Sequence, residues 1–304
     1  MKASQIYAKT MKFVWIKLGI GALIAGISLV LLAIVVGISL LANSGGLLLV
    51  LGLIWYILTY GVFRAVMHYM GYMIKAAHIA VVSEAVTTGV IPDNMVHVGK
   101  EMVRRRFAAS NVYIVLDKLV GGAVKQLQRT VGSVGNLLSD VPGMGTIVSI
   151  LQMFIGVALG YIDECCLGYT FYKKDDKAFK AGCDGVVIYF QNTKHLLKSA
   201  VGTTAIVLGL SFVAWLVPFI IFGLLFGLFG MPFAWLFSAL VSIIVAAAIK
   251  SAFIDSYMMV KTMVAYMSVA PSTQITFDIY DKLSKLSGKF KELFTRAKQE
   301  HASN

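Results

Sequence analysis

The chain has 304 residues, of which 58% are hydrophobic and only 14% are charged, and its formal net charge is +12. This composition is far more apolar than that of an ordinary soluble domain, and several apolar runs reach the roughly 20 residues that a helix needs to span a bilayer. The runs are continuous and rich in Leu, Ile and Val, unlike the alternating strands of outer-membrane barrels. The sequence therefore predicts an all-α, polytopic membrane protein.

The positive charge has two interpretations. Basic chains often bind nucleic acid, but here Lys and Arg flank the apolar runs, as they do in cytoplasmic loops near anionic headgroups. We therefore expect anionic membrane lipid, and not nucleic acid, as the partner of the basic residues. The sequence also lacks enzyme signatures, zinc-ligand spacing and nucleotide loops. It predicts neither an enzyme nor a metal or cofactor site.

The apolar runs pair into three helical hairpins in chain order. The pairs are residues 18–42 with 47–87, 122–140 with 145–172, and 201–229 with 233–266. The turns at 43–46 and 227–232 carry no Lys or Arg, whereas the connectors 88–115 and 173–200 are basic. By the positive-inside rule, the connectors and both termini are cytoplasmic. We expect connector 173–200 to form an amphipathic helix. We expect about six segments in the cell membrane: five clear or possible spans and one polar or re-entrant segment.

The polar segment belongs to the middle hairpin. Residues 145–172 could cross a bilayer, but residues 122–140 are too polar to face lipid. We include residues 122–140 because otherwise two basic regions, one ending at Arg106 and one starting at Lys173, would lie on opposite faces. This helix must then be shielded from lipid or dip in and return. The alternative is that it lies on the membrane surface.

The C-terminal region predicts a separate helix. We divide the chain into a transmembrane domain, 1–269, and a basic cytoplasmic segment, 270–304. An apolar stripe with 4-3-4-3 spacing runs along this segment at Ile279, Leu283, Leu286, Phe290 and Leu293. Such a stripe suits a coiled coil or an amphipathic helix on a membrane or a subunit. Gly288 disfavours the coiled coil, so we favour the surface or docking helix.

Three acids within apolar runs are the main functional candidates. Asp163 and Glu164 follow Tyr161-Ile162, and Asp255 similarly follows Phe253-Ile254, an echo that suggests a diverged duplication of the last two hairpins. Acids in hydrocarbon are costly and often mark a solute path. The alternative is that they lie at the interface, paired with lysines. Lys250 precedes Asp255 by about one and a half turns, so we predict that these two side chains do not pair.

Other residues could line the path or pack its helices. In residues 122–140, basic and amide side chains would favour anions if the segment crosses, or form a solvated face if it does not. The i, i+4 residues Arg64 and His68 could form a gate, or Arg64 could snorkel to the headgroups. The path candidates beyond the acids are Lys250, Lys125, Gln128, Arg129, Asn136, Arg64 and His68. The pairs Gly156/Gly160 and Gly223/Gly227 have the spacing of close-packed membrane helices.

Two short segments resemble choline transporter-like membrane proteins. Val112–Lys118, VYIVLDK, is similar to a V-V-V-L-D-K element in the C-terminal region of that family, and Phe179–Leu196 is similar to an amphipathic segment of the family. The chain is shorter than the members of the family and lacks their large extracellular loop. The resemblance implies a transport role and carries over no substrate residues.

The sequence thus predicts an oligomeric channel or transporter for a small polar or charged solute. The alternative is a non-transporting scaffold whose basic cytoplasmic face binds anionic lipid or a partner.

Overall fold

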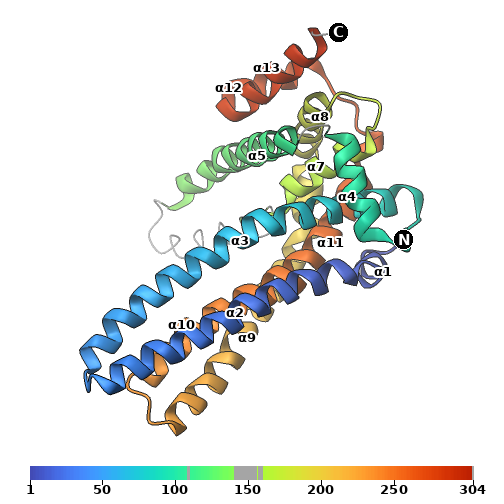
Figure 1. Ribbon diagram of the computed structural model, residues 1–304. Coiled ribbons are helices and arrows are strands. Elements are labelled where there is room, and N and C mark those ends of the chain that lie inside the picture. Colours follow the sequence, from blue (N-terminus) through green and yellow to red (C-terminus); the bar gives the residue numbers. More distant parts are fainter. Residues whose placement is uncertain (108–109, 140–155, 157–159, 303–304) are drawn as a thin grey trace. The chain divides into compact units, whose positions relative to one another are not determined.

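The computed structural model describes residues 1–107, 110–139, 156 and 160–302, and these residues form helices and turns without a strand (Figure 1). The predicted all-α class is therefore confirmed for the described part of the chain. The chain divides into two compact units. Unit 1 comprises Met1–Thr10, Ala76–Ile206 and Tyr257–Asn304, and unit 2 comprises Met11–Lys75 and Val207–Ser256.

Long apolar helices build unit 2. They are α2 (Met11–Leu41), the first part of α3 (Gly45–Thr88), the second part of α9 (Thr193–Leu228), and α10 (Ala234–Ile249). In the described part of the whole chain, four stretches are long and apolar enough to cross a membrane: Met11–Leu41, Gly45–Thr88, Thr204–Leu228 and Ala234–Ser272. The helices of the first and third predicted hairpins are therefore present, as expected of a membrane protein. In the middle hairpin, residues 140–155 and 157–159 lie outside the described residues.

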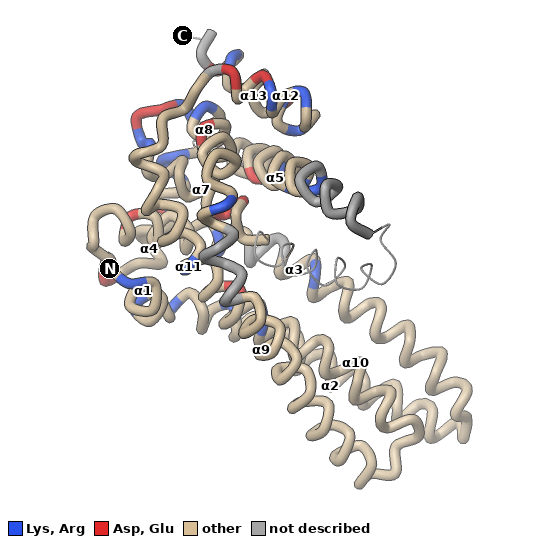
Figure 2. Tube along the Cα trace, turned by 180° about the vertical axis from the view of Figure 1, so that it is seen from behind, with Lys and Arg blue, Asp and Glu red and all other residues tan. Residues whose placement is uncertain are grey.

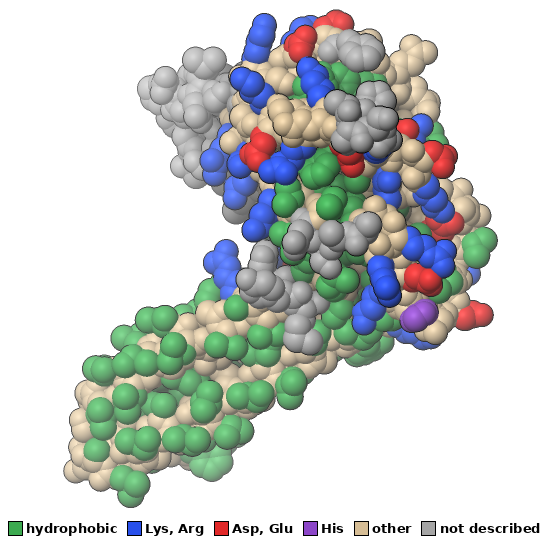
Figure 3. All heavy atoms as spheres, turned by 45° about the horizontal axis from the view of Figure 1, so that its top comes forward, with side chains coloured by type: hydrophobic (Ala, Val, Ile, Leu, Met, Phe, Trp, Pro, Cys, Tyr) green, Lys and Arg blue, Asp and Glu red, His purple; other side chains and the backbone are tan. Residues whose placement is uncertain are grey.

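The centre of unit 2 is packed with large side chains. Leu32, Trp55 and Phe237 are almost completely buried in one cluster with aliphatic neighbours. The Trp55 indole Nε1–H donates to the Ser28 carbonyl at 2.9 Å, which satisfies its polar group in the apolar core. Leu, Ile and Val side chains instead cover the outer surface, and Figure 3 shows the predominance of hydrophobic side chains on one face of this unit. An apolar outer surface is what a lipid-facing bundle requires.

The predicted glycine pairs differ in their surroundings. Gly223 lies directly against the Trp235 ring, so that a Cβ there would fall 2.2 Å from the ring. Gly227 has no neighbour within 4 Å of such a Cβ. Gly156 and Gly160 are both exposed. In unit 2, one glycine of the Gly223/Gly227 pair therefore permits a close contact between α9 and α10.

Unit 1 contains shorter helices with most of the charge. Figure 2 shows Lys, Arg, Asp and Glu concentrated on these helices, whereas α2, α9 and α10 are nearly free of them. The helices are α1 (Ala3–Lys9), α4 (Met95–Arg106), α5 (Ser110–Ser139), α7 (Ile162–Tyr172), α8 (Ala178–Gln191), most of α11 (Asp255–Met267), α12 (Phe277–Leu286) and α13 (Gly288–Ala302). The unit also includes the last part of α3 and the first part of α9.

Helix α8 lies at the centre of unit 1, where we had predicted an amphipathic connector over residues 173–200. Its residues from Ala181 to Tyr189 are all buried, so it has no solvated face along this length. It packs against α5, α7, α12 and α13. The solvated face expected of an amphipathic helix is therefore absent from Ala181 to Tyr189, because neighbouring helices cover α8 there.

The C-terminal region forms two helices that break at Ser287. The Ser287 Oγ accepts a hydrogen bond from the Phe290 backbone N–H at 3.0 Å and donates to the Gln126 Oε1 of α5 at 2.7 Å. This arrangement caps the start of α13 and fixes it to α5. Leu283, Phe290 and Leu293 of the predicted stripe are buried, whereas Leu286 is 46% exposed. The stripe therefore packs on α5 and α8 of its own chain, and the compact unit does not end at residue 270.

Candidate functional site

The sequence of unit 2 contains one acidic residue, Asp255. Its five basic residues are Lys12, Lys17, Arg64, Lys75 and Lys250. An acid within a membrane-length helix requires a partner or water, because burying an isolated charge is costly. The surroundings of Asp255 therefore define the first candidate site.

Asp255 is paired with Lys250 across a π-helical turn. Residues Lys250–Ile254 form this turn between α10 and α11. The Lys250 Nζ lies 2.5 Å from the Asp255 Oδ1. An α-helix has 3.6 residues per turn and would separate residues i and i+5, but the wider π turn brings them together. The prediction that these two side chains do not pair is therefore wrong.

Helix α2 buttresses this turn with a second lysine. Lys17 is only 7% exposed, and its Nζ donates to the Ser256 Oγ at 2.9 Å. The Trp15 ring packs edge-on against Phe253 of the π turn, with ring centroids 5.7 Å apart. Two lysines and one aspartate thus surround a local departure from α-helical geometry. Such π turns are frequent at functional sites.

The other two acids belong to unit 1. Asp163 and Glu164 lie in the first turn of α7, where the helix dipole favours negative charge. The Asp163 carboxylate faces Gly121 of α5, and Glu164 is only 7% exposed. Because Asp255 belongs to unit 2, the repeated tripeptide pattern does not gather the three acids within one unit. Residues Gly160 and Tyr161 form a turn just before α7, so the acids begin a helix.

The remaining predicted path residues are distributed over α3 and α5. Lys125 and Arg129 are exposed on α5, and Arg64 is exposed on α3. Gln128 hydrogen-bonds to the hydroxyl of Tyr189, whose pKa burial raises to about 12. The side chains of Asn136 and His68 lie outside the described part of the structure. Gln128 therefore has a structural contact with α8.

Sequence reasoning missed a buried ionic cluster in unit 1. Asp184 of α8 is 5% exposed and accepts hydrogen bonds from the Lys180 Nζ, at 2.7 Å to Oδ2, and from the Tyr280 hydroxyl of α12. Burial and the bond to Asp184 raise the pKa of Tyr280. The only signal in the sequence was the i, i+4 spacing of Lys180 and Asp184. The cluster joins α8 to the C-terminal helices.

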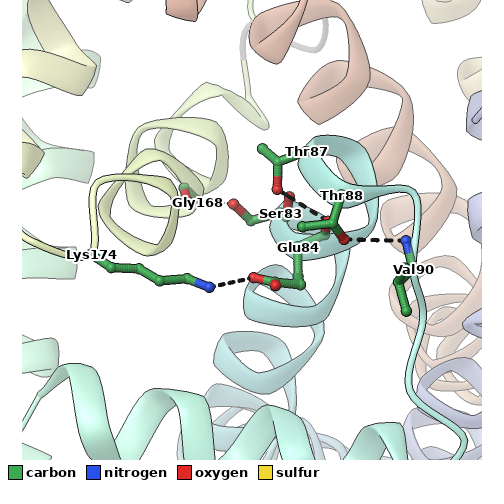
Figure 4. A network of polar contacts seen from close by, with 7 residues as sticks. All are labelled: Ser83, Glu84, Thr87, Thr88, Val90, Gly168 and Lys174. Atoms are coloured by element: carbon green, nitrogen blue, oxygen red, sulfur yellow. Dashed lines mark hydrogen bonds and ion pairs between the residues drawn. The ribbon is translucent and has the colours of Figure 1, made fainter.

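A second polar network joins α3 to α7 in unit 1 (Figure 4). The Ser83 Oγ donates to the Gly168 carbonyl at 2.8 Å. At the next residue of α3, the Glu84 Oε2 lies 2.8 Å from the Lys174 Nζ, as Figure 4 shows. The sequence places Lys174 in the basic connector 173–200 and does not predict its pairing with Glu84. Their pairing holds Lys174, which follows α7, beside the end of α3.

The three cysteines of unit 1 are buried, and this gives a first testable prediction. Cys165, Cys166 and Cys183 are all reduced and buried, and burial raises the pKa of Cys183. Since the thiolate is the reactive form, we expect none of the three to react rapidly with a thiol reagent near neutral pH. All three should react once detergent denaturation unfolds the chain. Rapid labelling of the native protein would contradict the described packing of α7 and α8.

Within the described residues, four helices are long and apolar enough to cross a membrane, which is the pattern of a helical membrane protein. No protein-family model, curated protein or solved structure matches the chain. The resemblance to choline transporter-like membrane proteins therefore stays a prediction.

Proposed function

We propose that this chain is an integral membrane transport protein, a channel or transporter for a small polar or charged solute. The observation that carries the proposal is the Lys250–Asp255 pair on the π turn of a membrane-length helix. Ionisable groups at such positions are expensive to maintain and commonly serve solute or ion pathways. The proposal includes the predicted six-segment topology with cytoplasmic termini in the cell membrane.

The pair can act as a contact that a solute replaces. The side chains of Lys250 and Asp255 are 43% and 33% exposed, so a charged solute can reach either partner. The centre of unit 2 is filled by Leu32, Trp55 and Phe237. We therefore place the path beside this core, along the Lys250–Asp255 pair, where a second copy of the chain supplies the opposite wall. This is why the proposal includes an oligomer.

Neutralising the pair tests the proposal. In proteoliposomes or planar bilayers, Asp255→Asn and Lys250→Gln are each expected to change ion or solute flux by about tenfold, because removing one partner leaves the other charge uncompensated. The reversed pair, Lys250→Asp with Asp255→Lys, should restore part of the flux. Asp281→Asn is the matched control, since it removes an exposed acid of α12 in unit 1. Unchanged flux in both single variants would rule out the assignment of this pair.

A second function is favoured by the distribution of charge. Unit 1 contains 22 of the 27 Lys and Arg residues of the chain, which suits a scaffold that binds anionic lipid. Protein in neutral detergent should then bind phosphatidylserine vesicles, and high salt should weaken the binding. Salt-insensitive binding, or none, would leave transport as the better proposal.

A further inference from the structure

A pocket in unit 1 combines positive charge with an apolar floor. It has a volume of about 280 Å³ and is lined by Met102, Arg105, Arg106, Phe171 and Lys174. This volume lies just below the roughly 300–1,000 Å³ typical of sites for drug-sized molecules, so it suits a smaller group. The residues come from the end of α4 and from the end of α7 and the segment that follows it. The pocket is therefore large enough for a small ligand or a lipid headgroup.

Each of the three cations is held in place by a contact beside the pocket. Arg106 donates to the carbonyl oxygens of Lys173, at 3.2 Å, and Lys174, at 3.4 Å. Arg105 pairs with Glu101 at 2.6 Å. Lys174 pairs with Glu84 at 2.8 Å, the contact drawn in Figure 4. These contacts restrict the cationic side chains before a ligand binds. The entropic cost of ordering them on binding is therefore smaller.

The charged side chains that line the pocket are all positive. Its described lining contains three cations and no carboxylate, because Glu84 and Glu101 hold the cations from outside the lining. Burial lowers the pKa of Arg106, although Glu300, Asp176 and Asp175 oppose this effect from nearby. A partly desolvated guanidinium gains more from a new anionic partner than a solvated one does.

The floor of the pocket adds an apolar requirement. Phe171 is 3% exposed and packs edge-on against Phe107, with centroids 5.6 Å apart. Met102 lies on α4. Its flexible thioether side chain can adapt to ligands of different shape. A ligand that carries both an anionic group and an apolar portion would use both parts of the lining.

We propose that Arg105, Arg106 and Lys174 bind a phosphate group, with Phe171 and Met102 contacting the apolar portion attached to it. The ligand is a phosphomonoester, either the headgroup of an anionic lipid or a phosphorylated small molecule. Arginine and lysine together recognise phosphate well, since the guanidinium offers a planar fork and the ammonium a point charge. The proposal does not depend on transport, because Lys250 and Asp255 belong to unit 2.

The test measures binding to the full chain in maltoside detergent, which contains no phosphate. The probes for calorimetry are inorganic phosphate, phenyl phosphate and dihexanoyl phosphatidic acid below its micellar concentration. We expect phosphatidic acid to bind. The double variant R105Q/K174Q should weaken its binding by about tenfold or more, because it removes two charge-assisted contacts. The charge-preserving R105K/K174R should retain most of the affinity.

A matched double variant separates the pocket from general surface charge. Arg104→Gln with Lys173→Gln removes the same charges from exposed neighbours that do not line the pocket. We expect it to weaken binding by less than about threefold, since neither side chain lines the pocket and salt screens charges that act from a distance. Equal losses in the two double variants, or no binding of any probe to the wild type, would overturn the proposal.

The probes also identify the source of the phosphate group. If phosphatidic acid binds and phenyl phosphate does not, the pocket accepts a lipid headgroup. If phenyl phosphate binds equally well and shows the same loss in R105Q/K174Q, the ligand is a phosphorylated small molecule. Weaker binding of inorganic phosphate than of phenyl phosphate would support the role of the apolar floor.

Discussion

Replacing Gly185 by alanine is expected to lower the free energy of unfolding of unit 1 by about 2–3 kcal/mol, as overpacking of a filled core does. A Cβ at this position would lie 2.9 Å from the Cys166 carbonyl oxygen and 3.1 Å from the Cys166 Cα. Both are backbone atoms of α7, so the clash cannot be relieved by turning a side chain. The Gly185 carbonyl also accepts a hydrogen bond from the Tyr266 hydroxyl at 2.8 Å. Helices α7 and α8 must therefore move apart to admit a methyl group.

The control for this substitution is Gly288→Ala. A Cβ at Gly288, the first residue of α13, has no neighbour within 4 Å, so the change should be neutral or slightly stabilising. Unfolding in detergent would be followed by the rate at which the buried cysteines react with a thiol reagent. If Gly185→Ala and Gly288→Ala gave the same rate, the close approach of α7 and α8 would be wrong.

The apolar helices and their turns were predictable because their signals are local. Long runs of Leu, Ile and Val set the helices of the first and third hairpins, and turn-forming residues end them. Asn43 and Gly230, near the tips of these hairpins, have positive φ values of 46° and 62°. Asparagine and glycine adopt this conformation at low cost. Neither the length of a run nor its turn residues depend on distant contacts.

The Lys250–Asp255 contact was not predictable from helical periodicity. Its geometry depends on a single π turn, which changes the angle between the two residues without changing their spacing in the sequence. The lysine that buttresses the turn, Lys17, comes from a helix more than two hundred residues away. The sequence indicated Lys250 and Asp255 as charges in an apolar run, but it could not supply their contacts.

The burial of α8 could have been inferred from the spacing of its small residues, which a hydropathy scan does not take into account. Small residues recur at Ala178, Ala181, Gly182 and Gly185, the i, i+3, i+4 and i+7 spacing of one helix face. Such a face permits close approach of a neighbouring helix. The charges of the surrounding segment suggested a solvated connector instead. The hydrogen-bond partners of Asp184 come from α8 itself and from α12, and only the fold reveals the second of these.

Removing the Asp184 carboxylate is expected to release the C-terminal helices from α8. Asp184→Ala should cost about 2–4 kcal/mol, somewhat less than the loss of a fully buried ion pair, because Lys180 is 47% exposed and can turn toward water. The Tyr280 hydroxyl has less freedom, since Tyr280 is only 3% exposed. Tyr280→Phe should therefore cost about 1 kcal/mol, the usual net value of one hydrogen bond.

Limited proteolysis can locate this effect as well as measure it. Residues 273–276 connect α11 to α12 without helical structure, and cleavage there should accelerate in Asp184→Ala as α12 and α13 detach. Asp281→Ala removes an exposed acid of α12 and should leave the cleavage rate unchanged. If both alanine variants were cleaved at the wild-type rate, the Asp184 cluster would not hold the C-terminal helices. Their attachment would then depend on the apolar contacts of Leu283, Phe290 and Leu293.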